Sequence, residues 1–564
     1  MLRNNKIIKK IPEYVSRVTD TLKKANFEAF VVGGCVRDLI IGKEPKDWDI
    51  TTNAKPDEII NLFEKTVYEN KFGTVRVFWP IKDIMDKKQA IVTCETIENK
   101  TDNVSSETKY NIVEVTPYRT EAIYTDFRHP DEISFSDNIE EDLKRRDFTI
   151  NALALDVTRE TIKDMTDYKN LKDISSKGHL IDLFDGLKDI KDRVIRAVGN
   201  PSDRFQEDAL RMLRAVRFST ELDFAISYDT MSAVVEHSKL TEKVSFERIR
   251  DEFTKIIMSE NPVSGIILLQ KLGLLKYIVP ELEEGIGCEQ KGAHIYDVWE
   301  HLLHALDHAS KKGWPLEIRL SALFHDIGKP RSRRDTYLAK GIKDNFERSG
   351  ASSSLVRGPS KSSFIPEANK KQYTFYGHEV IGERMTKKIM ERLKYPKQTT
   401  DLVLSFTRNH MFFSDTEKIT LSAVRRIVQH VGKDHIWDLM KVRECDRVGM
   451  KKKEAPYRLR KYHAMIEEVL HDPISVGQLA IDGKYMIEVL GMLPGPRMGW
   501  ILNALLEEVL DDPTKNTKEH LSELIKSLDM LGNAELKVLG DRGKEKREEK
   551  EEEEIKKLHI KHGV

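Results

Sequence analysis

Hydrophobic positions near the start of the chain follow two different periods. Residues 11–25 place valines and a leucine on one face of a helical repeat, which predicts an amphipathic helix. Short apolar runs bounded by turn residues follow at 30–32, 73–78 and 111–118, and such runs are typical of strands. This mixture predicts a small α/β unit at the beginning of the chain.

Two glycines directly follow the first apolar run. Gly33 and Gly34 let the backbone turn tightly and approach a ligand with no Cβ in the way. Residues 36–41 then predict a short helix whose first amides face a phosphate, and Gly42 would end it. Arg37 adds a planar cation suited to phosphate oxygens. The stretch therefore predicts a phosphate-binding strand–turn–helix unit.

Carboxylates follow this unit. Asp47 and Asp49 are two residues apart, which at strand spacing puts both on one face. Glu114, on the strand predicted at 111–118, could join them as a third carboxylate. Neighbouring carboxylates repel each other unless a cation lies between them, and carboxylates that hold Mg²⁺ while a triphosphate supplies further oxygens are the expected arrangement. Alone, a glycine pair would be an ordinary turn and the aspartates a solvated loop, but here they occur together.

The string from Gly33 to Asp49, GGCVRDLIIGKEPKDWD, resembles the signature of class II tRNA nucleotidyltransferases and bacterial poly(A) polymerases. These belong to the polymerase-β-type nucleotidyltransferase superfamily. The resemblance implies that Asp47, Asp49 and Glu114 are catalytic and that the first two hold Mg²⁺. It implies that Gly33, Gly34 and Arg37 bind the nucleotide.

A second stretch, EDLKRRDFTINA at 141–152, is similar to the second motif of the same family. Arg146 corresponds to the family arginine that contacts the nucleotide, and Asp147 and Asn151 would brace the sugar side of the pocket or the fold itself. Residues 124–130 resemble the flexible loop that enzymes adding only the two cytidines tend to have shortened. Its presence favours the complete reaction.

Residues 204–218, RFQEDALRMLRAVRF, predict one helix with an apolar face. Its other face carries Asp208, Arg211, Arg214 and Arg217 at intervals of three. Adjacent arginines repel unless anions separate them, so this face is either a salt-bridged surface or part of a triphosphate site. The segment resembles the family's fourth motif, which implies that Asp208 and Arg211 bind the Watson–Crick edge of CTP or ATP in place of a template. Residues 246–253 resemble the fifth motif and predict a structural helix.

A separate constellation of histidines and aspartates begins further along the chain. His325 and Asp326 are adjacent and follow His301, a pattern typical of metal ligands. The stretch resembles the HD phosphohydrolase domain, and later candidate ligands are His378, His410 and Asp446. Imidazole favours transition metals such as Ni²⁺, Mn²⁺ or Co²⁺, whereas an all-oxygen site favours Mg²⁺. The alternative is a histidine–aspartate pair that only caps helices.

Composition limits the class of protein. A chain of 564 residues exceeds what one core supports, so several domains are expected. Lysine plus arginine equals aspartate plus glutamate at 93 each, which argues against a uniformly basic surface but not against a local basic patch. The four cysteines are scattered, which predicts a reducing compartment. With no apolar stretch long enough to span a bilayer, we expect a cytoplasmic protein without a membrane partner.

The predicted fold is α+β, a small polymerase-β-type α/β head followed by an all-α neck, HD body and tail. The predicted boundaries are 11–155 for the head, 156–260 for the neck, 261–450 for the HD domain with an insertion at 344–371, 451–530 for a tRNA-binding tail and 531–564 for a charged extension. The tail assignment rests on residues 478–516, which resemble the C-terminal element that some class II enzymes carry after the HD region.

The resemblance implies template-independent addition of CCA to the 3′ end of tRNA with CTP, ATP and Mg²⁺, and a second phosphohydrolase activity in the HD domain. Alternatives are a bacterial poly(A) polymerase, a partial enzyme that adds only CC or only A, or an HD phosphohydrolase with an RNA-binding head. The HD stretch weighs against the first, the intact loop against CC addition alone, and retention of both Asp47 and Asp49 against the last. The sequence carries no signal for an oligomeric state.

Overall fold

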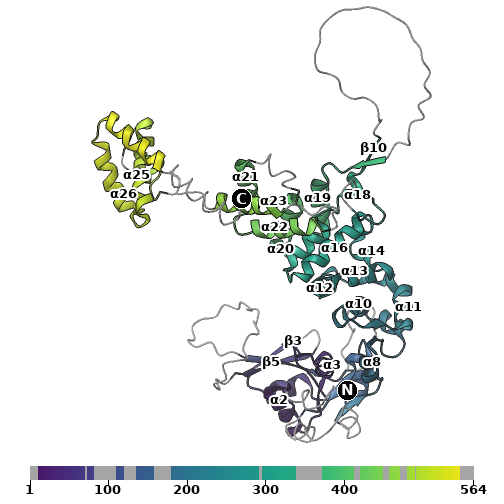
Figure 1. The fold of residues 1–564 in the computed structure, drawn as a ribbon. Coiled ribbons are helices and arrows are strands. Elements are labelled where there is room, and N and C mark those ends of the chain that lie inside the picture. The colour runs from purple at the N-terminus through teal and green to yellow at the C-terminus, as the bar shows by residue number, and fades with distance from the viewer. Residues whose placement is uncertain are drawn as a thin grey trace, which may run out of the picture. The chain divides into compact units, whose positions relative to one another are not determined.

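The computed structural model describes residues 10–69, 73–81, 110–119, 135–157, 179–290, 295–337, 371–411, 420–448, 456–470, 479–489 and 491–546. It divides the chain into two compact units, one formed by Met1–Glu283 with Ile389–Pro396 and the other by Glu284–Lys388 with Lys397–Val564 (Figure 1). The predicted flexible loop at 124–130 and nearly all of the predicted insertion at 344–371 lie outside the described residues. The finer domain boundaries stay predictions.

The head is built on one seven-stranded sheet with strand order β3-β4-β5-β2-β1-β6-β7. Its strands are β1 (Ala29–Val32), β2 (Asp49–Thr52), β3 (Thr66–Glu69), β4 (Thr74–Pro80), β5 (Tyr110–Pro117), β6 (Leu153–Leu155) and β7 (Leu180–Asp182). Strands β2 and β5 are parallel, whereas the other neighbouring pairs are antiparallel. The predicted strands correspond to β1, β2, β4 and β5.

Helices of the head are α2 (Glu13–Lys24), α3 (Gly34–Ile41), α4 (Pro56–Leu62) and α5 (Ile139–Lys144), with a 3₁₀ turn η1 (Thr149–Asn151). The apolar face of α2 is buried in the core that it shares with the sheet, as its periodicity predicts. Helix α3 begins two residues earlier than expected, because Gly33 turns the backbone with φ 81°. Gly42 ends α3 in the left-handed conformation, which confirms the predicted helix end.

The helical neck consists of α8 (Gly186–Asp192), α9 (Pro201–Glu207), α10 (Leu210–Leu222), α11 (Tyr228–His237), α12 (Phe246–Met258), α13 (Pro262–Lys271), α14 (Leu275–Ile278) and α15 (Pro280–Glu283), with strands β8 (Val194–Ile195) and β9 (Ala225–Ile226) and a 3₁₀ turn η2 (Ser238–Lys243). The prediction of one helix over 204–218 is wrong, since the chain is extended at Asp208. The Asp208 carboxylate accepts a hydrogen bond from the Leu210 amide, so this aspartate ends one helix and supports the start of the next.

The helices that follow are α16 (Val298–Lys311), α17 (Leu316–Phe324), α18 (Lys329–Ser332), α19 (His378–Arg392), α20 (Lys397–Asn409), α21 (Leu421–Val431), α22 (Ile436–Asp446) and α23 (Pro456–Leu470). They belong to the second unit, except for the end of α19 from Ile389, which belongs to the first. A hairpin of β10 (Arg334–Tyr337) and β11 (Lys371–Thr374) precedes α19. Helices α16, α20, α21, α22 and α23 bury a common apolar core.

The tail contains α24 (Gly483–Glu488), α25 (Pro496–Asp511), η4 (Pro513–Lys515), α26 (Lys518–Asp529) and helical residues 533–546. Leu536 belongs to its core. A Cβ at Gly540 would lie 2.7 Å from the Cα of Trp500, and one at Gly543 would lie 2.1 Å from the Asn503 carbonyl oxygen. The charged extension predicted from residue 531 therefore begins with residues that pack closely against α25.

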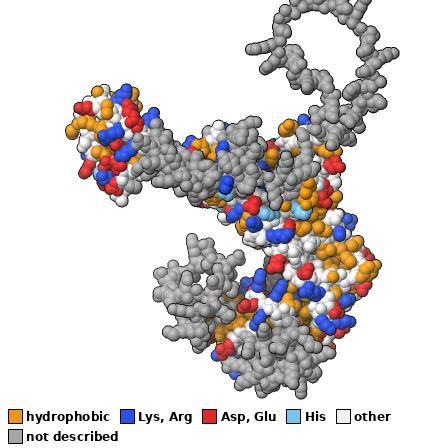
Figure 2. Space-filling model, in the orientation of Figure 1, with side chains coloured by type: hydrophobic (Ala, Val, Ile, Leu, Met, Phe, Trp, Pro, Cys, Tyr) orange, Lys and Arg blue, Asp and Glu red, His pale blue; other side chains and the backbone are white. Residues whose placement is uncertain are grey.

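Surface charge follows the composition. On the face drawn in Figure 2, basic and acidic side chains are interspersed over the described residues, in line with their equal numbers in the sequence. Within the described part of the chain, no helix is both long and apolar enough to cross a membrane.

Candidate functional site

The head brings two of its three predicted catalytic carboxylates together through strand register. Asp49 on β2 lies directly opposite Glu114 on the parallel strand β5, so both side chains project from the same face of the sheet. Asp47 lies in the bend before β2, so the expected strand relation between the two aspartates is wrong. Burial raises the pKa of Asp49 to about 6, and the charges of Glu114 and Asp47 also raise it, whereas Arg146 opposes the rise.

This cluster suits a divalent cation. Carboxylate oxygens are the donors that Mg²⁺ prefers, and their mutual repulsion around a buried Asp49 is what a cation would relieve. Arg76, which sequence reasoning missed, places its Nε 3.0 Å from Glu114 Oε1 from the neighbouring strand β4. Its signal in the sequence is only an arginine on the predicted strand at 73–78.

Gly33 lies where an arginine approaches the backbone. A Cβ at this position would be 3.1 Å from Arg146 Nη1 and 3.8 Å from Asp49 Oδ2. The positive φ of 81° separately favours glycine. The structure thus joins Gly33, Arg146 and Asp49, three residues that the motifs singled out.

Arg37 has its donors engaged within the fold. It is buried, donates from Nε and Nη2 to Asp38 Oδ1 at 2.9 and 2.8 Å, and donates from Nη1 to Asn151 Oδ1 at 2.7 Å. Its guanidinium also lies beside the space above Gly34, 3.5 Å from where a Cβ would be. The arginine thereby links α3 to η1, and its contact with a phosphate stays a prediction.

The neck arginines are separated by protein carboxylates. The pairs are Arg211 with Glu207 at 2.6 Å, Arg214 with Asp147 at 2.6 Å and Arg217 with Glu252 at 2.9 Å. Arg217 is buried against α12, so the structure favours a role in the fold over the expected triphosphate contact. Asp208 is paired with Arg248 of α12 at 2.7 Å. Arg248 and Glu252 were missed, because the predicted helix at 246–253 gave no sign of which residues it faces.

Asp147 links α10 to η1. Its carboxylate accepts from Arg214 Nε at 2.7 Å and from Asn151 Nδ2 at 3.2 Å. Burial alone would raise the pKa of Asp147, but Arg214 and Asn151 outweigh it and lower the pKa to about 2. Asp147 is therefore ionised in the folded protein except at strongly acidic pH.

Replacing Asp147 should reduce stability in a pH-dependent way. Because the folded-state pKa lies near 2, below the ordinary value of 3.8, the carboxylate stabilises the fold above about pH 4 and loses this effect as the pH falls towards 2. We expect Asp147→Asn to lower the free energy of unfolding by about 2 kcal/mol at pH 7 and by less at pH 3, measured by urea denaturation. Asp192→Asn, at an exposed aspartate of α8, is the control. An equal loss at both pH values would contradict the account.

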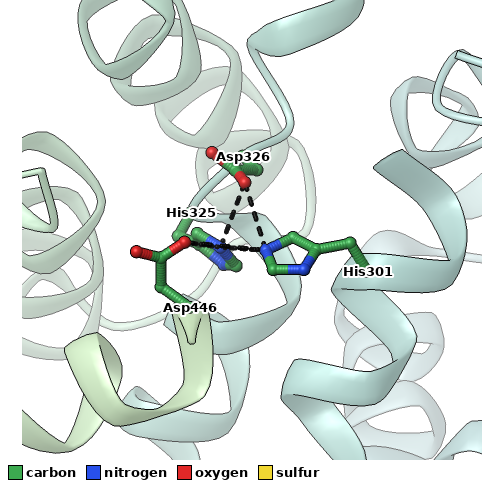
Figure 3. A group of neighbouring side chains, drawn as sticks. All are labelled: His301, His325, Asp326 and Asp446. Atoms are coloured by element: carbon green, nitrogen blue, oxygen red, sulfur yellow. Dashed lines mark hydrogen bonds and ion pairs between the residues drawn. The ribbon is translucent and has the colours of Figure 1, made fainter. Parts of the chain in front are cut away.

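Four HD residues converge at one point (Figure 3). His301 Nε2 lies 3.2 Å from Asp326 Oδ2 and 3.6 Å from Asp446 Oδ1. His325 Nε2 lies 3.3 and 3.5 Å from the same two atoms. The side chains come from α16, the end of α17 and the end of α22, so the structure confirms that the predicted residues form one buried cluster.

The other predicted HD residues gather on the opposite oxygen of Asp326. His378 Nε2 lies 3.2 Å from Oδ1, and His410 Nε2 lies 3.5 Å from it. Both histidines are buried, and among the residues that the structure describes neither Nε2 has a hydrogen-bond partner. Asp326 is thereby shared by two groups of ligand atoms.

Backbone carbonyls orient three of these imidazoles. The Nδ1 atoms of His325, His378 and His410 lie 2.9, 2.7 and 2.7 Å from the carbonyl oxygens of Ala322, Phe375 and Thr407, in each case three residues earlier. A proton on Nδ1 that donates to a carbonyl leaves the Nε2 lone pair directed at Asp326. In their neutral form these side chains therefore present the tautomer that binds a metal.

The two buried carboxylates of the cluster favour positively charged groups around them. Burial alone would lower the pKa of His325, but Asp326 and Asp446 raise it to about 9. Lys329 Nζ, 2.5 Å from Asp326 Oδ2, together with His325 holds the pKa of Asp326 well below its ordinary value despite burial. A mixed set of imidazole and carboxylate donors in such a field fits a transition metal. Lys329, three residues after Asp326 in the same string, was missed.

A glycine after the His-Asp pair allows the second group to form. A Cβ at Gly328, just after the His-Asp pair, would lie 2.2 Å from the His378 carbonyl oxygen and 2.5 Å from the Gly382 amide nitrogen. A Cβ at Gly382 would meet only ordinary contacts of 3.5 Å or more. Close backbone packing against Gly328 therefore sets where α19 begins and where His378 lies.

Gly328→Ala and Gly382→Ala form a matched pair of variants. Since a Cβ at position 328 overlaps the backbone of α19, we expect Gly328→Ala to lower the free energy of unfolding by about 1–3 kcal/mol. Gly382→Ala should be neutral or stabilising, because alanine favours a helix over glycine. Urea denaturation measures both. Equal stability of the two variants would show that α19 does not pack against Gly328 in this way.

Comparisons with known proteins match the segments of the chain that contain the two clusters. Family models match the poly(A) polymerase head domain at 29–89 and 80–196, a probable RNA- and SrmB-binding site of polymerase A at 223–286, an HD domain at 294–448 and a putative tRNA nucleotidyltransferase domain 2 at 378–525. The chain thus combines a match to the poly(A) polymerase head domain with a match to the HD domain.

Among curated relatives, the CCA-adding enzyme of Ligilactobacillus salivarius is 40% identical over 275 residues, covering 48% of this chain and 56% of that protein. The CCA-adding enzyme of Enterococcus faecalis is 39% identical over 281 residues, covering 49% and 57%. The chain thus spans little more than half the length of these relatives. The solved CCA-adding enzyme of Bacillus stearothermophilus with CTP shares the fold, with TM-score 0.53, 24% identity and coverage of 91% of this chain and 97% of that one.

Proposed function

We propose that the protein adds CCA to the 3′ end of tRNA from CTP and ATP, without a nucleic-acid template. The observation that carries the proposal is the β2–β5 register, which sets Asp49 opposite Glu114 beside Gly33 and Arg146. The similarity of the head to CCA-adding enzymes supports the same reaction.

Asp47, Asp49 and Glu114 would hold Mg²⁺. When bound, the cation activates the terminal 3′-hydroxyl and stabilises charge on the α-phosphate and the leaving pyrophosphate. The protein's own part is to orient the nucleotide. Arg146 lies over Gly33, where its guanidinium can bind a phosphate or sugar oxygen next to the carboxylates.

Base choice would rest on Asp208 and Arg211. A carboxylate accepts from the exocyclic amino group of cytosine or adenine, and an arginine donates to cytosine O2 and N3 or to adenine N1. Both side chains are held by ion pairs, Asp208 with Arg248 and Arg211 with Glu207. These pairs would limit the rotamers of both groups before the base arrives, which reduces the entropy lost on binding.

Other readings of the head have less support. A poly(A) polymerase would not account for the six converging HD residues. An RNA-binding head without catalysis would not account for a buried Asp49 kept beside Glu114 despite their repulsion. Addition of only CC or only A is the nearest alternative, and product sequencing separates it from full addition.

Removal of the head carboxylates should abolish addition without unfolding the protein. Because burial raises the pKa of Asp49, its charge does not stabilise the fold, and Asp49→Ala should remain folded. We expect Asp47→Ala and Asp49→Ala each to cost several kcal/mol of transition-state stabilisation while tRNA binding persists, measured by nucleotide incorporation and by filter binding. Asp57→Ala, at an exposed residue of α4, is the control. Near-normal incorporation by either variant would falsify the assignment.

Base discrimination should depend on Arg211 of α10 and on Asp208 at the end of α9. Asp208→Ala and Arg211→Ala should each cost about 1–3 kcal/mol of discrimination between CTP or ATP and the other nucleotides, because a base-edge hydrogen bond is lost. Arg217→Ala should instead lower stability through its pair with Glu252 and leave base choice unchanged. Misincorporation rates of the three variants provide the measurement. Wild-type fidelity in the Asp208 and Arg211 variants would contradict the proposal that protein side chains replace a template.

We propose a second activity for the HD cluster, the hydrolysis of phosphoesters such as 2′,3′-cyclic phosphates. The observation that favours it is the sharing of Asp326 between two ligand groups. His301, His325 and Asp446 would hold one cation with Asp326, and His378 and His410 would hold another with the same carboxylate, with Ni²⁺, Mn²⁺ or Co²⁺ as the candidates. Such cations, when bound, polarise a phosphoester and activate water.

Metal analysis separates this activity from the first. His325→Ala with Asp326→Ala should remove bound transition metal and hydrolysis and leave CCA addition largely intact, whereas His378→Ala with His410→Ala should leave a single cation. Elemental analysis and a phosphoester panel provide the readouts, and His308→Ala, whose ring bonds Glu444 outside the cluster, is the control. No metal and no hydrolysis in the wild type would mean that the His-Asp pair only caps helices. Loss of CCA addition would mean that the metal holds the body together for tRNA binding.

A further inference from the structure

Arg211, the proposed base-recognition arginine, also holds part of the head. Its guanidinium donates to Glu207 Oε2 at 2.6 Å and to the Arg204 carbonyl oxygen at 3.2 Å, both within the α9–α10 region. It also donates from Nη2 to the carbonyl oxygen of Arg145 at 2.9 Å. Arg145 is the C-cap residue of α5 and directly precedes Arg146. One side chain therefore contacts both the neck and the end of α5.

The end of α5 is held by the neck at several neighbouring residues. Arg204 Nη1 lies 3.3 Å from the Lys144 carbonyl oxygen, and Arg214 is paired with the Asp147 carboxylate. Together with the contact from Arg211, these arginines meet the chain at residues 144, 145 and 147. The position of Arg146, between them, depends on the neck.

Asp142 transmits this position to the guanidinium of Arg146. Its carboxylate has no exposed surface, accepts from Arg146 Nη2 at 3.0 Å and accepts from Arg145 Nε at 3.0 Å. Burial alone would raise the pKa of Asp142, but Arg146 and Arg145 hold it below its ordinary value. A charged carboxylate with both oxygens engaged ties the Arg146 side chain to α5.

Arg146 reaches the catalytic turn at its other end. Nη1 lies 3.1 Å from where a Cβ on Gly33 would be, and the charge of Arg146 lowers the pKa of Asp49. A continuous path of contacts therefore runs from Arg211 through α5, Asp142 and Arg146 to Gly33.

From this path we infer that Asp142 is a positioning residue that links base recognition to phosphate positioning. The inference rests on the proposed nucleotide addition. A base can draw Arg211 away only by weakening the bond that Arg211 makes to the end of α5. A matching base is one that Arg211 can bind while it keeps this bond, so that α5 stays in place and Arg146 stays over the glycine turn. A mismatched base can be bound only if the bond weakens, which shifts α5 and Arg146. Discrimination should therefore be visible in kcat as well as in KM, because misplacement by about 1 Å can cost up to about 100-fold in rate.

Steady-state kinetics of Asp142→Asn test the inference. Asparagine keeps the shape of the side chain and removes the charge that both arginines require. With tRNA that lacks CCA, we expect kcat for CTP to fall about tenfold or more while KM for CTP changes less than about threefold. The ratio of kcat for CTP to kcat for UTP should also shrink. Glu140→Gln, at an exposed carboxylate of the same helix, should match the wild type.

Three outcomes would overturn the inference. These are a loss confined to KM, a loss that only follows the folded fraction in thermal denaturation, and additive effects of Asp142→Asn and Arg146→Lys in the double variant, since residues that act in series are non-additive. If Asp142→Asn does not fold, Arg204→Met decides, because it releases the Lys144 carbonyl and should give the same kcat-selective loss. A wild type that adds no nucleotide refutes the proposed function, whereas an active wild type with a normal Asp142→Asn refutes only the inference.

Discussion

The parallel pairing of β2 with β5 is the constraint on which the head depends. It sets Asp49 opposite Glu114, and burial together with the neighbouring negative charges raises the pKa of Asp49 to about 6. Holding carboxylates in this way lowers the free energy of unfolding unless a cation binds between them. Two arginines reduce the repulsion between these carboxylates. Arg76 pairs with Glu114, and Arg146 approaches Asp49 through the space that Gly33 leaves. The neck arginines then hold the end of α5, so that the position of Arg146 depends on the helices proposed to select the base.

The HD cluster also holds carboxylates close together in the protein interior, but with different donor atoms around them. Asp326 is completely buried, and histidines lie at both of its oxygens. Carbonyls three residues earlier orient three of the imidazoles, and Gly328 lets α19 approach closely enough to bring His378 to the carboxylate. The head offers oxygen donors alone, whereas this cluster adds nitrogen donors. One chain thus carries two clusters of candidate cation ligands, and their donor atoms differ in the metals that they favour.

The sequence predicted the residues of both sites better than the contacts among them. Short motifs singled out Gly33, Asp49, Glu114 and the six HD residues, which the structure brings together in two clusters, because residue type and local spacing are enough to indicate such chemistry. Helical periodicity continues through Asp208, so the break there was missed, although an aspartate before a helix is a common cap. Arg248 becomes evident as the partner of Asp208 only when distant segments pack. Asp142 and Lys329 lie three or four residues from their partners, so helical spacing carried a signal for them that was missed. The segment after residue 530 was predicted only as a charged extension. Its many charged residues conceal Leu536, which belongs to the tail core, and two glycines that pack on α25.

In the proposed reaction, side chains of the protein rather than a nucleic-acid template select each nucleotide added to tRNA. Sequencing of the products formed on tRNA that lacks its CCA end, with CTP alone, ATP alone and both together, tests it most directly. The account predicts two added cytidines with CTP alone and a completed CCA end with both nucleotides. A run of adenosines with ATP alone, or no extension under any of the three conditions, would contradict it.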